Sequence, residues 1–129
     1  MAKEILIVDD EPNVIIPLQF LMEQHGYKVM IASRGEDALD LVYRYKPDLV
    51  LLDIMLPGID GYEVCEIIRL NPNYRNIKII FLTVKDSDVE IAKGMALGAD
   101  AYITKPISNA VLVAKVKEVL EKTYEEARE

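Results

Sequence analysis

Hydrophobic residues along the chain gather in five short runs, each of which ends at a polar or charged residue. Such runs are typical of buried β-strands, because a strand covered on both faces needs no polar alternation. The second run alternates between apolar and polar positions, which is typical of an edge strand with one wetter face. The predicted strands span residues 4–8, 27–32, 49–52, 77–82 and 101–104.

The segments between the strands carry apolar residues at helical spacing, and local signals mark where the helices begin and end. Pro12 suits the first turn of the first helix, and Gly26 suits its end. Ser33 to Glu36 and Ser87 to Glu90 have the spacing of capping boxes, and Ser108 is expected to cap the last helix. We therefore predict helices that alternate with the strands.

Pro17 disagrees with the helix predicted around it. A proline inside a helix lacks the backbone donor, and its ring crowds the carbonyl of the residue four positions earlier, here Asn13. The penalty is about 3 kcal/mol in a helix interior. We therefore expect a late helix start or a kink at this position.

The order of these elements predicts the fold class. Strands separated by helices run parallel, with right-handed crossovers and helices on both faces of the sheet. This indicates an α/β protein with a doubly wound five-stranded parallel sheet, (βα)5, in the flavodoxin-like order 2-1-3-4-5. Nothing in residues 1–129 reads as a linker or repeat, so a single domain is expected. In this order Asp9, Asp10 and Asp53 meet at the carboxyl ends of the first and third strands.

Composition narrows the function classes. The chain has 129 residues and a net charge of −7, which disfavours nonspecific nucleic-acid binding through the phosphate backbone. Its single cysteine, Cys65, permits no internal disulfide and no cysteine-based metal cluster. The apolar runs are too short to span a bilayer and no signal-peptide pattern opens the chain. We therefore expect a cytoplasmic protein that makes no contact with membranes.

The three carboxylates predict a cation site. Like charges in one crevice repel one another, so a counter-charge is needed to keep all three ionised. Mg²⁺ (or Mn²⁺) suits Asp9, Asp10 and Asp53, because it prefers oxygen ligands and sites that also receive a phosphoryl group. Lys105 and Thr83 end two further strands at the same edge, where an ammonium and a hydroxyl can contact that group. Aspartate can also act as a nucleophile toward phosphorus and form an acyl phosphate.

Four motifs on successive strand ends carry a family resemblance. They are Ile7 to Glu11, Asp48 to Gly61, Phe81 to Thr83 and Gly98 to Pro106. Each is weak alone, but in this order they are highly specific. With them the sequence closely resembles the receiver domains of two-component response regulators, of the chemotaxis-receiver kind. The resemblance covers residues 3–121, which become the expected core, and leaves 122–129 as the polar end of the last helix.

The resemblance implies the metal ligands and the acceptor. Asp53 would be the phosphoacceptor, and the cofactor would be Mg²⁺ (or Mn²⁺). Asp10 would hold the metal directly, and Asp9 would hold it through water. Asp53 and the backbone carbonyl of Met55 would complete the protein ligands.

The resemblance also implies the groups that bind and sense the phosphoryl group. Lys105 and Thr83 would both contact it. Tyr102 would be the switch aromatic that turns inward as Thr83 moves. The Lys105–Pro106 peptide bond would be cis.

The implied function is a signalling switch in a two-component phosphorelay. The donor would be a phosphohistidine on a sensor histidine kinase or a histidine phosphotransfer protein. The protein would catalyse only its own phosphorylation and its own slow dephosphorylation, so it is not classed as an enzyme. Its output would be a changed surface on the fourth helix, fifth strand and fifth helix, acting on a phosphorylation-dependent homodimer or a downstream protein partner. Ala110, Val111 and Ala114 lie off the buried stripe of the last helix and are candidates for that surface.

Some positions depart from the family pattern or flank the acceptor. Val84 stands where the family usually has alanine or another small residue, so its branched side chain is expected to narrow access to Asp53. Met55 and Lys85 flank the site where water attacks the phosphoaspartate, and their bulk and charge are expected to affect its lifetime. Pro17 lies beside the expected kinase-docking surface and is expected to affect partner choice.

Three rival functions remain at this point. A Mg²⁺-dependent phosphatase with an aspartyl nucleophile needs a second acid two residues after it, where this chain has Met55. A flavodoxin-like FMN protein needs a hydroxyl-rich phosphate loop, whereas Asp9, Asp10 and Glu11 repel a bare phosphate. A pseudo-receiver that takes no phosphate is disfavoured by the complete acceptor set. No output domain follows within these 129 residues, which suits either a protein that acts alone or a piece of a longer regulator.

Overall fold

The computed structural model describes residues 2–122, which form five strands, five α-helices and one short 3-10 helix. The strands are β1 (Glu4–Val8), β2 (Lys28–Ala32), β3 (Leu49–Leu52), β4 (Lys78–Thr83) and β5 (Ala101–Thr104). The helices are α1 (Pro12–Gln24), α2 (Gly35–Tyr45), α3 (Gly61–Leu70), the 3-10 helix η1 (Pro72–Tyr74), α4 (Asp88–Ala96) and α5 (Asn109–Glu121). The predicted alternation of strands and helices is confirmed.

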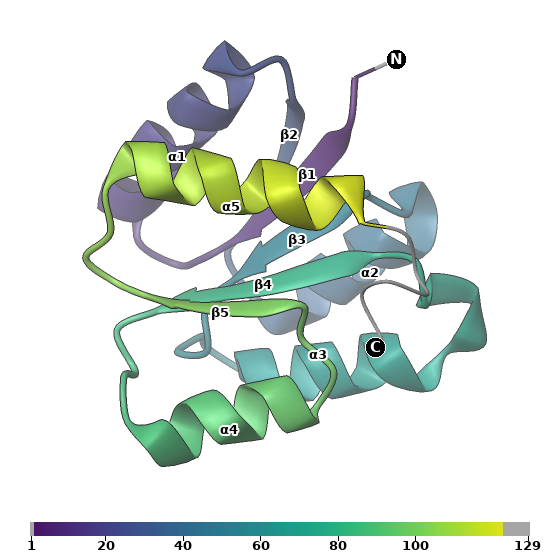
Figure 1. Cartoon of the computed structure of the whole chain (residues 1–129). Helices are drawn as coiled ribbons and strands as arrows, with labels where there is room; N and C mark the ends of the chain where they lie inside the picture. The colour runs from purple at the N-terminus through teal and green to yellow at the C-terminus, as the bar shows by residue number, and fades with distance from the viewer. Residues whose placement is uncertain (1, 123–129) are drawn as a thin grey trace.

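The strands form one parallel sheet in the order β2-β1-β3-β4-β5 (Figure 1). This confirms the predicted doubly wound fold, with the wetter strand β2 at one edge. The register pairs Val8 with Leu52, so β1 and β3 end level with each other. The residues that follow these strands therefore lie side by side at one edge of the sheet.

Alternate residues of the central strands point to opposite faces and build two hydrophobic layers. One layer joins Leu6 and Phe81 to α2, α3 and the segment that follows α4. The other joins Ile7 and Ile80 to α1 and α5. Figure 1 shows the same division, with α1 and α5 on one side of the sheet and α2, α3 and α4 on the other.

The first helix does not start late, which was one of the two alternatives expected at Pro17; the other, a kink, stays a prediction. It begins at Pro12, and its first turn closes where the backbone N–H groups of Val14 and Ile15 donate to the carbonyl of Glu11. Pro17 stands inside the helix. The buried contacts of the helix's apolar face hold the segment helical despite the missing donor, because tertiary packing routinely overrides a local propensity.

Helix caps were predicted correctly at two of three serines. The Ser87 and Ser108 hydroxyls accept from the backbone N–H groups of Glu90 and Val111. Ser33 does not cap α2, because the residue that precedes this helix is Arg34 and it makes no side-chain cap. A Cβ on Gly35 would stand 2.5 Å from the Ile59 side chain, so α2 starts in close contact with the loop after β3.

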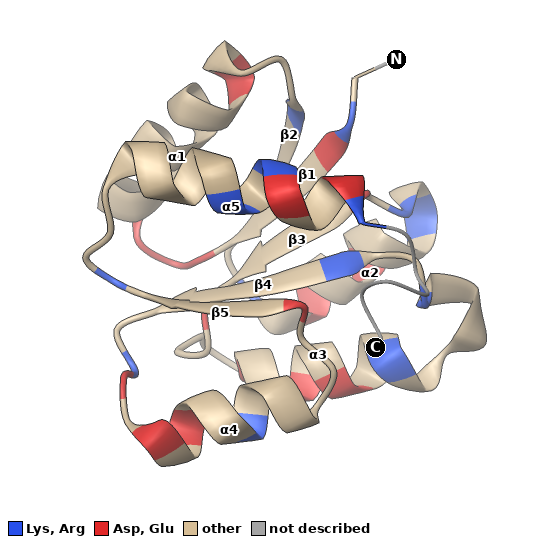
Figure 2. Ribbon diagram, viewed as in Figure 1, with Lys and Arg blue, Asp and Glu red and all other residues tan. Residues whose placement is uncertain are grey.

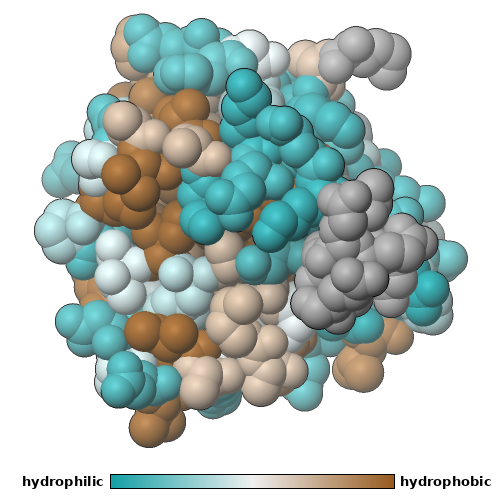
Figure 3. Space-filling model, viewed as in Figure 1, coloured by the Kyte–Doolittle hydropathy of each residue, from teal (hydrophilic) through white to brown (hydrophobic). Residues whose placement is uncertain are grey.

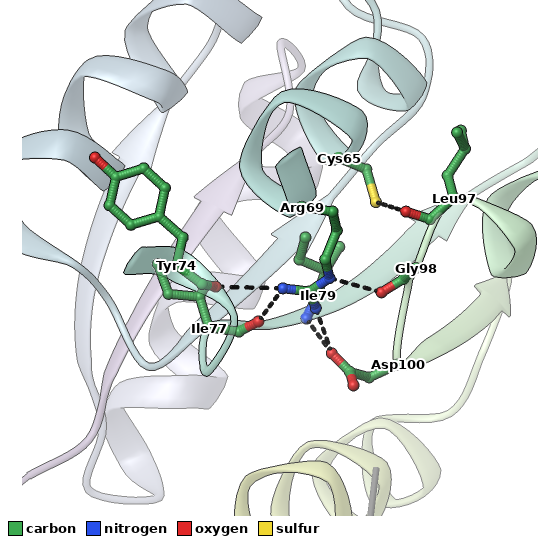
Figure 4. A network of polar contacts seen from close by, with 8 residues as sticks. All are labelled: Cys65, Arg69, Tyr74, Ile77, Ile79, Leu97, Gly98 and Asp100. Carbon is green, nitrogen blue, oxygen red and sulfur yellow. Dashed lines mark hydrogen bonds and ion pairs between the residues drawn. The ribbon is translucent and has the colours of Figure 1, made fainter. Parts of the chain in front are cut away.

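A buried guanidinium, that of Arg69, ties the end of η1 to the turn between α4 and β5, at the other end of the sheet from the acidic crevice. The Arg69 Nη2 atom lies 2.9 Å from Asp100 Oδ2, and both side chains are less than a tenth exposed. Arg69 also donates to the backbone carbonyls of Gly98 at 2.8 Å and Ile77 at 2.7 Å (Figure 4). One residue of α3 therefore links the segment before β4 to the turn before β5.

The end of the chain is described only as far as Lys122. Helix α5 ends at Glu121. Helical spacing predicted a buried stripe of Leu112, Val116, Val119 and Leu120; the first three are buried and Leu120 is partly buried. The polar end expected over residues 122–129 lies, apart from Lys122, outside the described residues. Within residues 2–122, no helix has the length and apolar character needed to cross a membrane.

Candidate functional site

The carboxyl ends of β1, β3, β4 and β5 bring the predicted site residues to one edge of the sheet. The Asp53 backbone N–H donates to the carbonyl of Val8 at 3.0 Å, which fixes the start of the loop after β3 beside β1. The Lys105 N–H donates in the same way to the carbonyl of Thr83 at 2.8 Å. Figure 2 shows the acidic loop after β1 and a basic segment between β5 and α5 at this edge.

Lys105 bridges two of the three carboxylates. Its Nζ atom lies 3.1 Å from Asp9 Oδ2 and 3.6 Å from Asp53 Oδ2. The side chains of Asp9, Asp53 and Lys105 are only 5%, 11% and 19% exposed, so these charges interact with little solvent screening. Asp10 stands next to them with its side chain exposed. The crevice thus holds three negative charges against one positive charge.

The surroundings of Asp53 oppose its ionisation more than water does. Burial raises the pKa of the Asp53 carboxyl above its usual value, and the opposing effects of Lys105 and of a hydrogen bond with Thr83 do not cancel that rise. The Met55 backbone N–H donates to Asp53 Oδ1 at 3.3 Å. Lys105 therefore compensates the buried negative charge only in part, and the remaining negative charge favours binding of a further cation.

Gly61 is a site residue that our sequence reasoning did not single out. It opens α3, and a Cβ at this position would overlap the carbonyl oxygen of Asp53. Its N–H donates to the carbonyl of Ile54 at 2.9 Å. The first turn of α3 is thus pressed against the backbone that carries the acceptor. The Asp60-Gly61 pair at the helix start was the available signal.

Thr83 and Tyr102 meet the same backbone position in the loop between β4 and α4. Thr83 is fully buried, and its hydroxyl accepts from the Lys85 N–H at 3.3 Å. The Tyr102 hydroxyl donates to the Lys85 carbonyl at 2.7 Å. The two predicted switch residues are therefore connected through one residue of this loop.

Val84, expected to affect access to Asp53, and Met55 and Lys85, expected to affect the lifetime of the phosphoaspartate, lie in different settings. Val84 is 58% exposed and lines a groove with Lys105 and Pro17. Met55 is exposed beside Asp53. The Lys85 ammonium lies 3.8 Å from Glu90 Oε2, so its charge is directed to the start of α4.

The donor chemistry of the crevice fits Mg²⁺. Among residues 2–122, no three acidic, histidine or cysteine side chains form a ready-made metal cage. Mg²⁺ does not need one, because it keeps several waters and is usually held by one or two carboxylates together with phosphate oxygens. Asp10, Asp53 and the Met55 carbonyl are oxygen donors of this kind, and the excess negative charge described above favours a cation.

These features define a doubly wound α/β protein with a lysine-neutralised acidic site at its topological switch point. The chain belongs to the response regulator receiver domain family, whose model matches residues 5–117. Receiver domains act in two-component signalling and interact with histidine kinases, and phosphorylation and Mg²⁺ binding are general features of the family. They are generally not classical enzymes.

Solved structures agree with this assignment. A putative response regulator from Chloroflexus aurantiacus is 35% identical, with a TM-score of 0.90 over 95% of this chain and 100% of that one. The BeF3-activated N-terminal receiver domain of RstA from Klebsiella pneumoniae is 37% identical, with a TM-score of 0.87 over 93% of this chain and 100% of that one. The chemotaxis response regulator CheY4 of Vibrio cholerae is 25% identical, with a TM-score of 0.86 over 92% of this chain and 99% of that one.

Proposed function

We propose that this domain takes a phosphoryl group from a phosphohistidine onto Asp53 and uses it as a reversible signal. The observation that carries the proposal is the shared contact of Lys105 with Asp9 and Asp53 in a buried crevice. A lysine held there meets the charge of an incoming phosphoryl group without a large rearrangement. The domain would thus serve as a switch in a phosphorelay rather than as a turnover enzyme.

In the proposed reaction a carboxylate oxygen of Asp53 attacks phosphorus. The new O–P bond forms as the P–N bond to the donor histidine breaks, and the imidazole nitrogen keeps the electron pair. Bound Mg²⁺, held by Asp10, Asp53 and the Met55 carbonyl directly and by Asp9 through water, would neutralise charge on the transferring group. Lys105 would turn from Asp9 toward the phosphoryl oxygens. Later attack of water on phosphorus returns the carboxylate and inorganic phosphate.

The proposed signal leaves the crevice through the loop between β4 and α4. A phosphoryl group that draws the Thr83 hydroxyl would disturb the bond between Thr83 and the Lys85 N–H. Because Tyr102 donates to the carbonyl of the same Lys85, its hold on the loop would change too. The surface made by α4, β5 and α5 would then present a different face to a homodimer partner or a downstream protein. Ala110, Val111 and Ala114 are exposed there.

The proposed donor surface is the groove between α1 and the loop that follows β5. It is lined mainly by apolar side chains and opens beside Lys105; its lining includes Val14, Pro17, Leu21, Val84 and Ile107. Figure 3 shows hydrophobic side chains gathered over α1 and the start of α5. A helix that carries a phosphohistidine on a sensor kinase or a histidine phosphotransfer protein would fit this groove. Cytoplasmic residence follows from that donor and is part of the proposal.

The test is adduct formation. The protein is incubated with acetyl phosphate and Mg²⁺, and its intact mass and its molecular size are measured. We expect one added phosphoryl group per chain, and no adduct when a chelator removes the metal. Absence of an adduct in the presence of Mg²⁺ would contradict the proposed function. A change from monomer to dimer on phosphorylation would assign the output to self-association.

Val84→Ala is expected to speed phosphorylation by acetyl phosphate. The exposed valine lines the groove beside Lys105, and the smaller side chain opens the approach to Asp53. We expect the phosphorylation rate to increase by less than about tenfold. A tenfold increase corresponds to a barrier lower by about 1.4 kcal/mol, which is more than the loss of two partly exposed methyl groups supplies. The rate is followed by intact mass against time. Val89→Ala, at an exposed position on α4, is the control, and equal rates for Val84→Ala and the wild type would refute the expectation.

A further inference from the structure

A second buried tyrosine lies beside the switch tyrosine. Tyr62 from α3, Phe81 from β4 and Tyr102 from β5 form a continuous aromatic row under α4. The ring centroids of Tyr62 and Phe81 are 5.6 Å apart, and those of Phe81 and Tyr102 are 5.7 Å apart. Tilted rings at such separations attract one another. The three side chains therefore form one packed unit that spans three elements.

The two hydroxyls in this row hold the same segment at two points. Tyr102 donates to the Lys85 carbonyl at 2.7 Å, at the start of the loop between β4 and α4. Tyr62 donates to the Glu90 carbonyl at 3.0 Å, in the first turn of α4. The Ser87 cap lies between these points and closes the turn by accepting from the Glu90 N–H. Residues 85–90 are thus fastened to the aromatic row at both ends.

Helix α4 is also in direct contact with the row. A Cβ on Gly94 would stand 2.9 Å from a ring carbon of Tyr102, so the helix can approach the switch ring this closely only with glycine there. The Lys93 Nζ atom lies 4.3 Å from the centroid of the Tyr62 ring. Burial raises the pKa of the Tyr62 hydroxyl, which keeps it a neutral donor near neutral pH. A shift of α4 therefore has to change the contacts of both tyrosines.

We infer that Tyr62 is a positioning residue of the switch, whose hydroxyl holds the first turn of α4 in the resting arrangement and so sets the position available to Tyr102. This inference rests on the proposed function and adds a residue to it. Movement of Tyr102 away from Lys85 releases one end of residues 85–90. The hydrogen bond from Tyr62 to the Glu90 carbonyl still holds the other end. The strength of that bond therefore sets how far the resting and activated arrangements of α4 differ.

The test is Tyr62→Phe, which removes the hydroxyl and keeps the ring. Amide hydrogen exchange of residues 88–96 is compared with and without Mg²⁺ and beryllofluoride. Without activation we expect exchange about twofold to tenfold faster than in the wild type, the effect of losing one hydrogen bond between uncharged groups. On activation we expect a smaller further change than in the wild type. Tyr43→Phe, which removes a hydroxyl at an exposed tyrosine, is the control.

The Tyr102 ring signal in NMR separates positioning from a merely structural role. Its assignment comes from Tyr102→Phe. We expect Tyr62→Phe to shift this signal, before activation, toward its activated position in the wild type. If the variant only loses stability while the signal and the α4 exchange match the wild type, the role of Tyr62 is refuted. If the wild type takes up no beryllofluoride, the proposed function fails, while unchanged resting exchange in Tyr62→Phe would by itself refute the inference.

Discussion

Asp53→Asn is expected to abolish the phosphoryl adduct while the fold is retained. Asparagine keeps the size of the side chain but replaces the nucleophilic carboxylate with an amide, which does not form an acyl phosphate. The neighbouring buried carboxylate, Asp9, is paired with Lys105, whose Nζ atom lies 3.1 Å from Asp9 Oδ2. We therefore expect no mass gain from acetyl phosphate and Mg²⁺ on a timescale that saturates the wild type.

Asp86→Asn is the matched control, because Asp86 is an exposed aspartate in the loop beside the crevice. It should be phosphorylated like the wild type. An adduct of undiminished amount on Asp53→Asn would refute the assignment of the acceptor. Peptide mapping of the wild-type adduct then decides which carboxylate carries the phosphoryl group.

Asp53→Asn should also be more stable than the wild type near neutral pH when the metal is removed. Burial raises the pKa of Asp53 in the folded protein, so ionisation of this group opposes folding. The folding free energy that comes from protonated Asp53 is fully present below its pKa in the unfolded chain, about 3.9. This contribution is lost as the pH rises through the higher pKa of the folded protein. Urea denaturation should therefore give a higher free energy of unfolding for Asp53→Asn than for the wild type at neutral pH. In acid the two free energies of unfolding should become equal.

The fold could be predicted from the sequence because its signals are local. The apolar runs that end at Val8, Leu52 and Leu82 mark buried parallel strands, and Gly26 marks the end of the first helix. A sheet with these crossovers then brings the strand ends to one edge, so the meeting of Asp9, Asp53 and Lys105 followed from topology. The Lys105–Pro106 bond is cis, as the resemblance implied.

What the sequence did not reveal depends on contacts between distant segments. Pro17 is accommodated because α1 packs on the sheet, and α2 starts at Gly35, in close contact with Ile59, without a cap from Ser33. Tyr62 was not singled out from the sequence, since its partner Glu90 is 28 residues away along the chain. Propensity and spacing carry no information about such pairs, which only the packed fold brings together.

The Arg69–Asp100 pair is another such contact, and its partners are 31 residues apart. Figure 4 shows the guanidinium at the centre of a network that reaches the backbone on either side of it. Asp100 Oδ2 accepts from Arg69 and also from the Ile79 backbone N–H at 2.8 Å. The Asp100 carboxylate therefore pairs with a buried cation and also satisfies a strand donor near the start of β4.

Asp100→Ala is accordingly expected to lower the free energy of unfolding by about 3–5 kcal/mol, the range for removing one partner of a buried ion pair. The variant removes the Asp100 carboxylate from beside the Arg69 guanidinium and the acceptor from the Ile79 N–H, and both penalties act in the folded state only. Asp40→Ala is the control, because the Arg44–Asp40 pair is more than half exposed and such pairs contribute about 1 kcal/mol or less. Urea unfolding measures both changes. The Arg69–Asp100 pair lies at the opposite end of the sheet from Asp53, so the folded fraction of Asp100→Ala should still accept a phosphoryl group. Equal losses of unfolding free energy in Asp100→Ala and Asp40→Ala would show that burial adds nothing to the pair.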